Sequence, residues 1–474
     1  MKTLRKMGAM LLALVMLLNL GACGKKQEEA TTAGETKTVA AESQAQTQEK
    51  EYPPVVSEPT TITFWHTRAT GVNSTNLEAA VEEFNKTNEY GITVEQEYIG
   101  SYSEVMAKCS TAIAAGNNPE LIIASEGGIG TMGMKNQYQD LAPYVERDGF
   151  DMSDFHQSLL TSLCIDTDGD GEKEIIGLPY VRSITVAIHN TKLFEAIGVA
   201  EDEIPGTIEE LVPMWKKIHE TTGKYGFAMF ADPSFYQDGL IQSLAVQQTG
   251  KSNGGVATNA TSAECLTDGT MLKMLQDWSS WCDEGWSWRY TITDTANVHR
   301  EMFYNGEVAT VFLSCGSLRG IINHCGEGTT VDGHFKAMMQ PGYGGNAGRV
   351  GGGNLMIIPQ NHTDQEIDAT WQFMKFLMSP EQVAKNSVDT GYLCVTKSGL
   401  EDPYLVESFN AQPNYWVAHN ELDGAFDASL ILYRDNWNAE LKNVFSAVIV
   451  DESMTPEEAV DYLKDQASVY LVEE

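Results

Sequence analysis

The sequence predicts an α/β fold made of two lobes, and three observations lead to this prediction. The chain has 474 residues, more than a single compact core normally holds. Hydrophobic residues make up 42% of it and aromatic residues 9%, a composition typical of a globular body. Short apolar stretches alternate with helical stretches of about a dozen residues, which is the pattern of parallel strand-helix-strand units.

The elements of the first part of the chain follow from local patterns. Residues 61–67, TITFWHT, are rich in β-branched and aromatic residues and are predicted as a buried strand. Residues 74–91 place apolar side chains on one face and end at Gly91, so a helix is predicted there. The next expected elements are a strand at 92–99, a helix at 103–116 capped by Ser103, and a strand at 120–125.

The same alternation continues to the C-terminus. A helix at 207–223 is opened by Thr207 and Glu210, which form a capping-box pattern, and the last helix carries a proline in its first turn. The other predicted elements are a strand at 177–190, a helix at 270–285, a helix end, turn and strand within 299–317, a glycine-rich strand at 350–360, two helices within 365–399, and the C-terminal helix at 455–474.

Polar and aromatic side chains follow the ends of the first three strands. Trp65 and His66 end the first strand, Tyr102 follows the second, and Glu126 follows the third. Ligands of open parallel sheets bind beyond the carboxyl ends of the strands, so these side chains are expected at one rim. The alternative for single residues is that Trp65 is half-buried under a loop and that His66 is an ordinary surface residue.

The N-terminus has the organisation of an export signal. Basic residues precede an apolar run at 7–20 that is too short for an ordinary membrane span. The run ends in Leu-Gly-Ala before Cys23, which resembles the lipobox of bacterial lipoproteins, where a peptidase cuts before the cysteine and the thiol is lipidated. Residues 1–22 are therefore the expected signal peptide, and 23–58 the lipidated cysteine and a polar, disordered tether. An ordinary signal peptide or anchor with an incidental cysteine is the alternative.

The net charge limits the classes of binding partner, and the cysteines leave the disulfide pairing open. The formal net charge is −35, from 31 basic and 66 acidic residues, which argues against nucleic acid and against an anionic membrane surface. We expect contact with the membrane through the lipid anchor only, on the extracellular or periplasmic side. Seven cysteines remain after Cys23, none of them in a CxxC pair, and their pairing does not follow from the sequence.

Several motifs, in order, resemble the extracellular solute-binding proteins of ABC importers. The similarity is to the branch that serves sugars, oligosaccharides and glycerol-3-phosphate, and it extends from about residue 61 to the C-terminus. The motifs are ITFWHT, YIGSYSEV, NNPELIIASEGG, GLPYVRSITVAIHN, FYNGEVATVFLSCGSL, VGGGNLMII and FLMSPEQVAKNSVDTGYLCVTKSG, after a lipobox and a polar tether.

The resemblance implies a two-lobed, periplasmic-binding-protein-like fold of type II, in which each lobe is a mostly parallel sheet flanked by helices and the ligand cleft lies between the lobes. The expected first lobe comprises 59–182 and 300–354, and the second lobe 183–299 and 355–474, which includes the C-terminal helices. The closed, liganded form would dock on the transmembrane subunits of an ABC permease. A monomer that needs no cofactor is implied.

The resemblance also implies ligand-binding positions. Matching motif by motif to the glycerophosphate-binding members gives Tyr102, Glu126, Ser183, Ser314, Gly352 and Tyr392. Those members carry a pair of tryptophans in the second lobe. The matching stretch here is FADPSFYQDG, so Phe230, Phe235 and Tyr236 are the expected aromatic platform.

One departure argues against a phosphorylated ligand. The phosphate binders use an arginine late in the chain, and the matching position here is Phe426, although Arg434 and Arg182 remain available. A phenyl ring cannot neutralise a phosphate, so a neutral sugar is expected. Sugars offer C–H faces to aromatic rings and hydroxyls to polar groups. The candidate rings are Trp65, Tyr102, Tyr236, Tyr392 and Trp416, and the candidate polar groups are Glu126, His66, Arg182 and Ser183.

An acidic loop suggests calcium. Asp166, Asp168 and Asp170 have the spacing of the start of an EF-hand loop, but its twelfth position is Gly177 rather than glutamate. A structural calcium site is one interpretation, and an acidic hairpin turn is the other.

Two other classes of function stay open. A secreted glycosidase would need two carboxylates across a cleft, and the pattern supports only Glu126. We therefore do not expect an enzyme. A sensor or adhesion lipoprotein that binds ligand without transport would share the same residues.

Overall fold

The structure is a computed structural model that describes residues 52–69, 71–125, 128, 132–133, 135–160, 162–167, 170–229, 263–291, 297–341, 350–420, 422 and 434–470. Side chains at positions 264, 350–354, 434 and 435 are not described. Residues 52–474 group into one unit by their contacts. The predicted signal peptide at 1–22, Cys23 and most of the expected tether lie outside the described residues.

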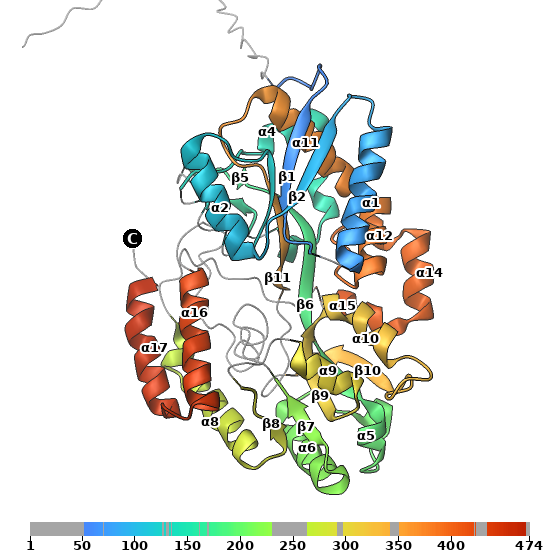
Figure 1. Ribbon diagram of the computed structural model, residues 1–474, viewed down its shortest axis with the longest axis vertical. Helices are drawn as coiled ribbons and strands as arrows, with labels where there is room; N and C mark the ends of the chain where they lie inside the picture. Colours follow the sequence, from blue (N-terminus) through green and yellow to red (C-terminus); the bar gives the residue numbers. More distant parts are fainter. Residues whose placement is uncertain are drawn as a thin grey trace, which may run out of the picture. The chain divides into compact units, whose positions relative to one another are not determined.

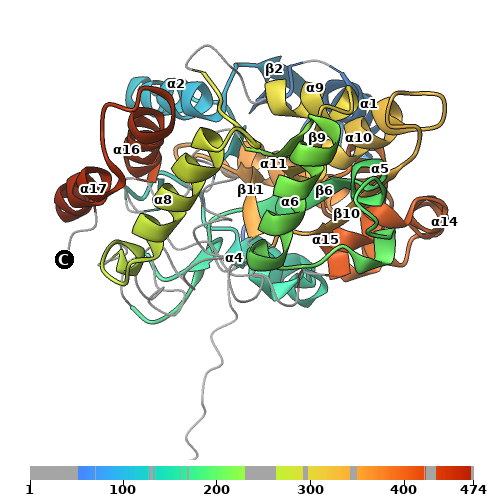
Figure 2. The ribbon, with the colours of Figure 1, turned by 90° about the horizontal axis from the view of Figure 1, so that it is seen from below.

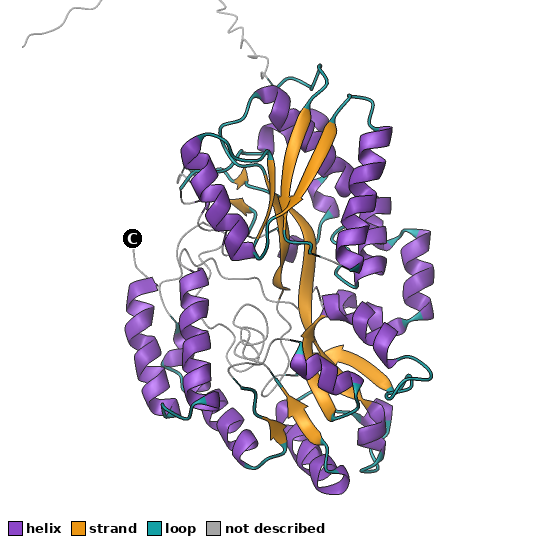
Figure 3. Cartoon of the chain, in the orientation of Figure 1, coloured by secondary structure: helices purple, strands orange, loops and turns teal. Residues whose placement is uncertain are grey.

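A mixed sheet forms the centre of this unit (Figures 1 and 3). Its strands are β1 (Thr61–His66), β2 (Thr93–Tyr98), β3 (Leu121–Ala124), β6 (Leu178–Asn190), β7 (Tyr225–Ala228), β8 (Ser287–Trp288), β9 (Val308–Ser314), β10 (Phe335–Met339) and β11 (Val350–Ile357). Their order is β2-β1-β3-β11-β6-β9-β7-β8, and β10 pairs with β6. A separate hairpin joins β4 (Cys164–Ile165) to β5 (Glu174–Ile175).

The α/β class is confirmed, and the strands of each lobe mostly run in one direction, with one reversed strand: β11 in the first lobe and β6 in the second. β1 is parallel to β2 and β3, as strand-helix-strand units require, and β7 is parallel to β8 and β9. β11 is antiparallel to β3 and β6, and β9 is antiparallel to β6. The reason is that β11 runs back beside β6, and a strand that returns next to the one that left is antiparallel to it.

β6 is a 13-residue strand that is buried along its whole length. It pairs with β11 up to Ile184, and from Thr185 it pairs with β9, with β10 on its other side from Val186. This change of partner divides the sheet into two parts. We call the part with β1, β2, β3, β11 and the start of β6 the first lobe, and the part with β7 to β10 and the rest of β6 the second lobe.

Helices cover both parts of the sheet. In the first lobe α1 packs on β2, α2 on β3 and α11 on β1, and in the second lobe α6 packs on β7 and α9 on β9. α8, α16 and α17 lie side by side in both views (Figures 1 and 2). The helices are α1 (Val72–Thr87), α2 (Tyr102–Ala115), α4 (Ala142–Asp148), α5 (Thr191–Glu195), α6 (Ile208–Thr222), α8 (Thr270–Asp283), α9 (Val298–Tyr304), α10 (Leu318–Cys325), α11 (Asp364–Leu377), α12 (Pro380–Thr390), α13 (Lys397–Leu400), α14 (Pro403–Ala411), α15 (Trp416–Asn420), α16 (Arg434–Phe445) and α17 (Pro456–Tyr470).

No described helix combines the length and the apolar composition needed to cross a membrane. No disulfide joins any of the seven described cysteines. Most are fully buried, and burial raises the pKa of the Cys282 thiol to about 11, so these thiols act as small apolar groups.

Strand pairing contradicts part of the predicted division of the chain. β9 and β10 lie within 300–354, which was assigned to the first lobe, yet they pair with β6 and β7 in the second. α11 packs on β1, so part of 355–474 belongs to the first lobe. The chain returns with β11 rather than near Arg300. Strand-helix units of the two lobes have the same local pattern, so only the pairing assigns them.

Residues 52–58, predicted as part of the tether, are instead held against the first lobe. The Val56 N–H donates to Asp368 Oδ2 at 2.7 Å, and Arg147 Nη1 donates to the carbonyl oxygen of Pro54 at 3.0 Å. Arg147 Nη2 also lies 2.5 Å from Asp368 Oδ1. Asp368 is fully buried, and a buried carboxylate requires such partners. The prediction missed this contact because Asp368 lies 312 residues after Val56.

An aromatic cluster fills the core of the second lobe. The Trp215 ring stacks on Phe227, with the ring centroids 4.8 Å apart, and its Nε1 donates to Thr310 Oγ1 at 2.9 Å. Trp286 packs against the same indole at 6.2 Å. β7 approaches α6 closely because Gly226 has no side chain, and a Cβ built there would lie 2.6 Å from the Trp215 Cα and carbonyl oxygen.

We predict that Gly226→Ala destabilises the protein by about 1–3 kcal/mol, because the methyl group overlaps the backbone of α6. Urea unfolding measures the change. Gly206→Ala is the matched control, since a Cβ at this exposed position meets no atom within 4 Å, and its expected effect is within about 0.5 kcal/mol. Equal stability of the two variants would contradict the close packing of β7 on α6.

Candidate functional site

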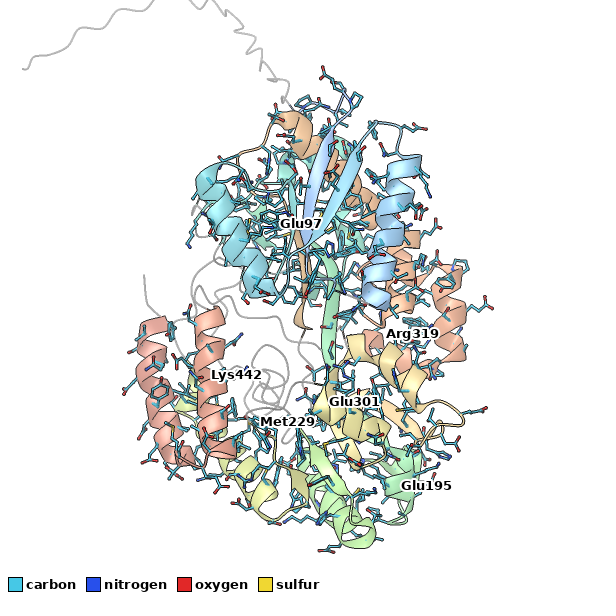
Figure 4. The ribbon with its side chains drawn as sticks, viewed as in Figure 1. Glu97, Glu195, Met229, Glu301, Arg319 and Lys442 are labelled. Carbon is cyan, nitrogen blue, oxygen red and sulfur yellow. The ribbon has the colours of Figure 1, made fainter. Side chains whose placement is uncertain are left out.

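An open cleft of about 580 Å³ lies beyond the carboxyl ends of β1 and β2. Its residues come from the loop after β1, the start of α1, the end of β2, the first turn of α2 and the loop after α12. They are Thr67, Arg68, Ala69, Asn73, Tyr98, Gly100, Ser101, Tyr102, Glu104 and Tyr392. This is the edge of the sheet at which the strand ends predicted a site. In Figure 4 the Glu97 label marks the end of β2.

Arg68 is a buried cation in the wall of the cleft. It follows β1 directly and is only 5% exposed. Its backbone N–H donates to His66 Nδ1 at 3.1 Å, which fixes the turn after the strand. The guanidinium carbon lies 5.3 Å from the centroid of the Tyr392 ring. Among the described residues, nothing accepts a hydrogen bond from its Nε or Nη2.

Tyr102 is the first residue of α2 and is half-buried. The N-cap is Ser101, not the predicted Ser103: the Glu104 N–H donates to Ser101 Oγ at 3.4 Å, and the Ser101 N–H donates to Glu104 Oε2 at 2.6 Å. Burial, followed by the neighbouring Tyr392, raises the pKa of Tyr102 well above its ordinary value. Tyr102 is therefore a neutral phenol at physiological pH, able to donate or accept a hydrogen bond.

Tyr392 is positioned by the backbone of its own loop. Its carbonyl oxygen accepts from Ser387 Oγ at 2.6 Å, and its N–H donates to Thr390 Oγ1 at 3.3 Å. The next N–H, of Leu393, donates to the carbonyl oxygen of Arg182 on β6 at 2.9 Å. The loop is thus attached to the strand that both lobes share.

His419 holds the same loop from α15. Its Nε2 accepts from the Cys394 N–H at 2.8 Å, and its Nδ1 lies 3.1 Å from the Tyr415 carbonyl oxygen, so the proton is on Nδ1. Burial lowers the pKa of His419 to about 4. The neutral ring is therefore required, because a protonated Nε2 could not accept the Cys394 N–H.

Gly316 lies against the ring of Tyr392. It lies in the short helix η5 (Cys315–Ser317), between β9 and α10, and Arg319 marks α10 in Figure 4. A Cβ built at Gly316 would lie 2.6 Å from Tyr392 Cζ and 2.8 Å from two other ring carbons. The missing side chain therefore lets the ring lie against the backbone of the second lobe.

Trp65 and His66 do not line the cleft in this structure. Trp65 is 7% exposed and belongs to a core with Val105 and Cys109 of α2, with Lys108 Nζ 4.0 Å from its ring centroid. Successive side chains of β1 face opposite sides, so Trp65 turns under α2. Burial, followed by the charge of Arg68, lowers the pKa of His66 to about 4, and its Nδ1 orients the turn that carries Arg68.

Apart from Tyr392, the described candidates from the later motifs lie outside the cleft wall. Arg182 and Ser183 are buried on β6, and the backbone of Ser183 pairs with Gly351, beside Gly352 on β11. Ser314 Oγ accepts from the Gly316 N–H at 3.1 Å and caps η5. Trp416 is half-buried, packs edge-on against Phe409, and donates to Asn410 Oδ1 at 3.3 Å. Of the residues singled out from the sequence, only Tyr102 and Tyr392 line the described cleft.

Other candidates fall on positions that are not described. These are Glu126, Phe230, Phe235, Tyr236, Phe426 and Asp168, and their roles stay predictions.

Sequence reasoning missed Arg68, Gly316 and the polar groups Thr67, Asn73 and Tyr98. Arg68 lies two residues after His66, inside the loop that was already expected at the rim, so its position was a usable signal. Nothing local marks Gly316 as the support of a ring that lies 76 positions later in the chain (316 and 392).

The acidic loop brings three described carboxylates together. Oxygen atoms of Asp166, Asp170 and Glu174 lie within 4.8 Å of one another. Glu174 Oε2 already accepts from the Thr167 N–H at 2.7 Å, and Asp166 Oδ2 accepts from the Gly171 N–H at 3.0 Å, as expected for an acidic turn. Asp168 lies outside the described residues, and calcium binding stays a prediction.

The cleft is suited to a polar organic ligand. Tyr98, Tyr102 and Tyr392 line it together with residues that carry hydroxyl, amide and guanidinium groups. Glu104 is the one carboxylate among the described lining residues, and it serves the cap of α2. The described wall therefore lacks the pair of carboxylates that glycoside hydrolysis uses.

Comparison with known proteins identifies the family. The model of a family described as bacterial extracellular solute-binding proteins matches residues 79–413. The sn-glycerol-3-phosphate-binding periplasmic protein UgpB of Salmonella typhimurium is 24% identical over 428 residues, covering 87% of this chain and 92% of the relative. The predicted resemblance is thereby confirmed.

Solved structures share the fold. The GacH receptor of Streptomyces glaucescens, known unliganded and in complex with acarbose, aligns with a TM-score of 0.71 at 16% identity, over 87% of this chain and 98% of that one. UgpB from Mycobacterium tuberculosis, in complex with glycerophosphocholine, aligns with a TM-score of 0.71 at 18% identity, over 86% and 98%. The expected two-lobed, type II binding-protein fold is confirmed, and at these identities the likeness concerns the fold alone.

We predict that His419→Gln makes stability less dependent on pH. The folded pKa of His419 is about 4, below the ordinary 6.5, so the unfolded chain binds the proton first as the pH falls. His419 therefore lowers stability progressively from about pH 6.5 to pH 4, by on the order of 1–3 kcal/mol. Glutamine can keep both hydrogen bonds without titrating. Urea midpoints between pH 7.5 and pH 4.5 measure the slope.

His324→Gln is the control for this comparison, because His324 is an exposed histidine on α10. Its slope should match that of the unchanged protein. If His419→Gln also kept the full slope, the neutral ring would not be what links α15 to the Tyr392 loop.

Proposed function

Because the chain belongs to the bacterial extracellular solute-binding proteins, we propose that it captures a carbohydrate in the cleft and delivers it to an ABC-type permease. The observation that carries the carbohydrate assignment is that three tyrosines and several polar groups line the same cleft. Sugar C–H faces pack on such rings, and sugar hydroxyls take up the polar groups. The GacH receptor, which shares the fold, was solved with acarbose.

A conformational step belongs to this proposal. Tyr392 is attached to β6 and rests on Gly316 of the second lobe, whereas Tyr102 and Arg68 belong to the first. A ligand that touches both groups changes the balance between arrangements of the lobes, and only its differential contacts can do so. The permease would recognise the liganded arrangement. The protein acts as a monomer and needs no cofactor in this proposal.

The nearest alternative is a glycerol-3-phosphate ligand. It is favoured by the relatives named for that solute and by the cation Arg68 in the cleft. A secreted glycosidase is disfavoured by the single described carboxylate of the wall. A lipoprotein sensor would bind the same ligand, and only loss of uptake in a strain without the protein separates it from a transport receptor.

We predict that a carbohydrate raises the melting temperature, since a ligand that binds only the folded state stabilises it by mass action. The panel holds neutral and acidic mono- and oligosaccharides, sugar alcohols and glycerol-3-phosphate. Tyr392→Ala should weaken binding about 10- to 100-fold, or about 1.4–2.8 kcal/mol. Gly316→Ala should weaken it too, because the methyl group displaces the Tyr392 ring.

Tyr90→Ala is the matched control, because Tyr90 is 44% exposed and lies outside the cleft wall. It should bind like the unchanged protein. A shift with glycerol-3-phosphate alone would refute the carbohydrate assignment, and consumption of an oligosaccharide by the purified protein would indicate an enzyme.

We also propose that Cys23 carries a lipid that holds the protein at the outer face of the cell membrane, as its lipobox-like context suggests. Cys23→Ser should release the exported protein from the membrane fraction, because no thiol remains to be acylated. Detergent phase partitioning of the two proteins measures this. Equal partitioning would mean that the N-terminal segment holds the protein at the membrane without lipid.

A further inference from the structure

Among the described residues of the cleft wall, Arg68 is the one whose buried side-chain donors lack acceptors. The residue lines the cleft yet is 95% buried, given its 5% exposure. Nε and Nη2 are shielded from solvent and find no acceptor among the described residues. A charged donor without water or a protein acceptor is costly, so these two groups are expected to have a partner in the working protein.

The two unsatisfied atoms define what that partner is. Nε–H and one N–H of Nη2 lie on the same edge of a guanidinium and point in parallel. This edge pairs with both oxygens of one carboxylate, in a two-bond arrangement that an ammonium group cannot reproduce. A single hydroxyl would satisfy only one of the two donors.

No described residue provides an acceptor at this edge. Within the described part of the chain, no carboxylate forms an ion pair with Arg68, and the one carboxylate of the wall, Glu104, accepts from the Ser101 N–H at 2.6 Å and from Ser101 Oγ at 2.8 Å. The Tyr392 ring lies 5.3 Å from the guanidinium carbon and helps to hold it in place. Arg182 is close enough to act on Tyr102 in the same direction as Arg68, so a second cation reinforces the potential.

The overall charge of the chain does not oppose an anion at this depth. The net charge of −35 is spread over the whole sequence, and at physiological ionic strength charges act over about 8 Å. In the described part of the wall, Arg68 and the nearby Arg182 stand against one carboxylate, Glu104. The expectation of a neutral sugar rested on Phe426, outside the described residues, and it did not consider Arg68.

We propose that Arg68 selects an acidic carbohydrate, whose carboxylate pairs side-on with Nε and Nη2 while a sugar ring lies against Tyr98 or Tyr102. This inference rests on the proposed function and narrows its ligand to sugars of the uronic acid class. Arg68 is then a specificity-determining residue of the cleft.

The test measures binding by calorimetry to pairs of sugars that differ only at C6. The pairs are glucuronate and glucose, galacturonate and galactose, mannuronate and mannose, and trigalacturonate and galactotriose, with glycerol-3-phosphate as a further arm. We expect at least one uronate to bind ten or more times more tightly than its neutral partner. Arg68→Gln should abolish this preference, and Arg68→Lys should keep only part of it, because lysine has the charge without the paired donors.

Lys108→Gln is the matched control, since it removes the same charge from the first lobe at a position outside the cleft wall, where Lys108 pairs with the exposed Glu97. It should leave the preference unchanged. A second readout needs no ligand: Arg68→Gln should raise the melting temperature of the free protein, because it removes a buried cation without partners. A lowered melting temperature would mean that Arg68 has a structural partner and would overturn the inference.

The binding outcomes also separate the two proposals. Equal or tighter binding of the neutral partners would overturn the acidic ligand and leave the carbohydrate receptor standing. Binding of glycerol-3-phosphate without any uronate would overturn both the carboxylate and the carbohydrate. Absence of binding by every sugar, charged or neutral, would refute the proposed function together with this inference.

Discussion

The fold depends on one strand that both lobes share. β6 is buried at all 13 positions, and its hydrogen-bonding groups must be satisfied along this whole length, which no single lobe could do. It therefore pairs with β11 up to Ile184 and with β9 and β10 beyond it. β11 shows irregular register between Gly351 and Gly353 and again at Leu355, close to this change of partner. The two lobes are thus joined by a continuous, desolvated ladder rather than by a flexible linker.

The cleft takes its chemistry from this arrangement. The loops after β1 and β2 deliver Arg68 and Tyr102 from the first lobe, and the Tyr392 loop is attached to β6 through the Leu393 N–H. Small contacts set the positions of these side chains: a neutral His419, a missing Cβ at Gly316 and a capping box at Ser101. The side chains that line the cleft are therefore preorganised by contacts within the protein, and this limits the conformational entropy that they lose when a ligand binds.

Two arginines of the first lobe, Arg147 and Arg68, differ in their partners. Arg147 neutralises the buried Asp368 and also binds the segment at 52–58, so charge pairing holds the start of the described chain to the first lobe. Arg68 is buried as well, but its donors on one edge have no acceptor within the described structure. The first buried charge is balanced inside the protein, whereas the second has no described partner, which supports the proposed acidic ligand. A buried donor without an acceptor destabilises the free protein, and a ligand that supplies the acceptor removes this cost.

The sequence by itself determined the α/β class and the rim beyond the first strands, with Tyr102 and Tyr392 at the cleft, because these follow from local periodicity and from motif order. It also predicted the strands β1, β2, β3, β6, β9 and β11 and the helices α1, α2, α6, α8, α11, α12 and α17, but not the short strands β4, β5, β7, β8 and β10. Only the tertiary structure decided which lobe receives β9, that Trp65 faces α2 instead of the cleft, that Arg68 lies in the cleft wall, and that Gly316 supports a distant ring. The physical reason is the separation along the chain of the residues that interact. Periodicity acts over a few residues, whereas strand pairing, burial of a charge and the approach of a ring to a glycine join residues tens to hundreds of positions apart.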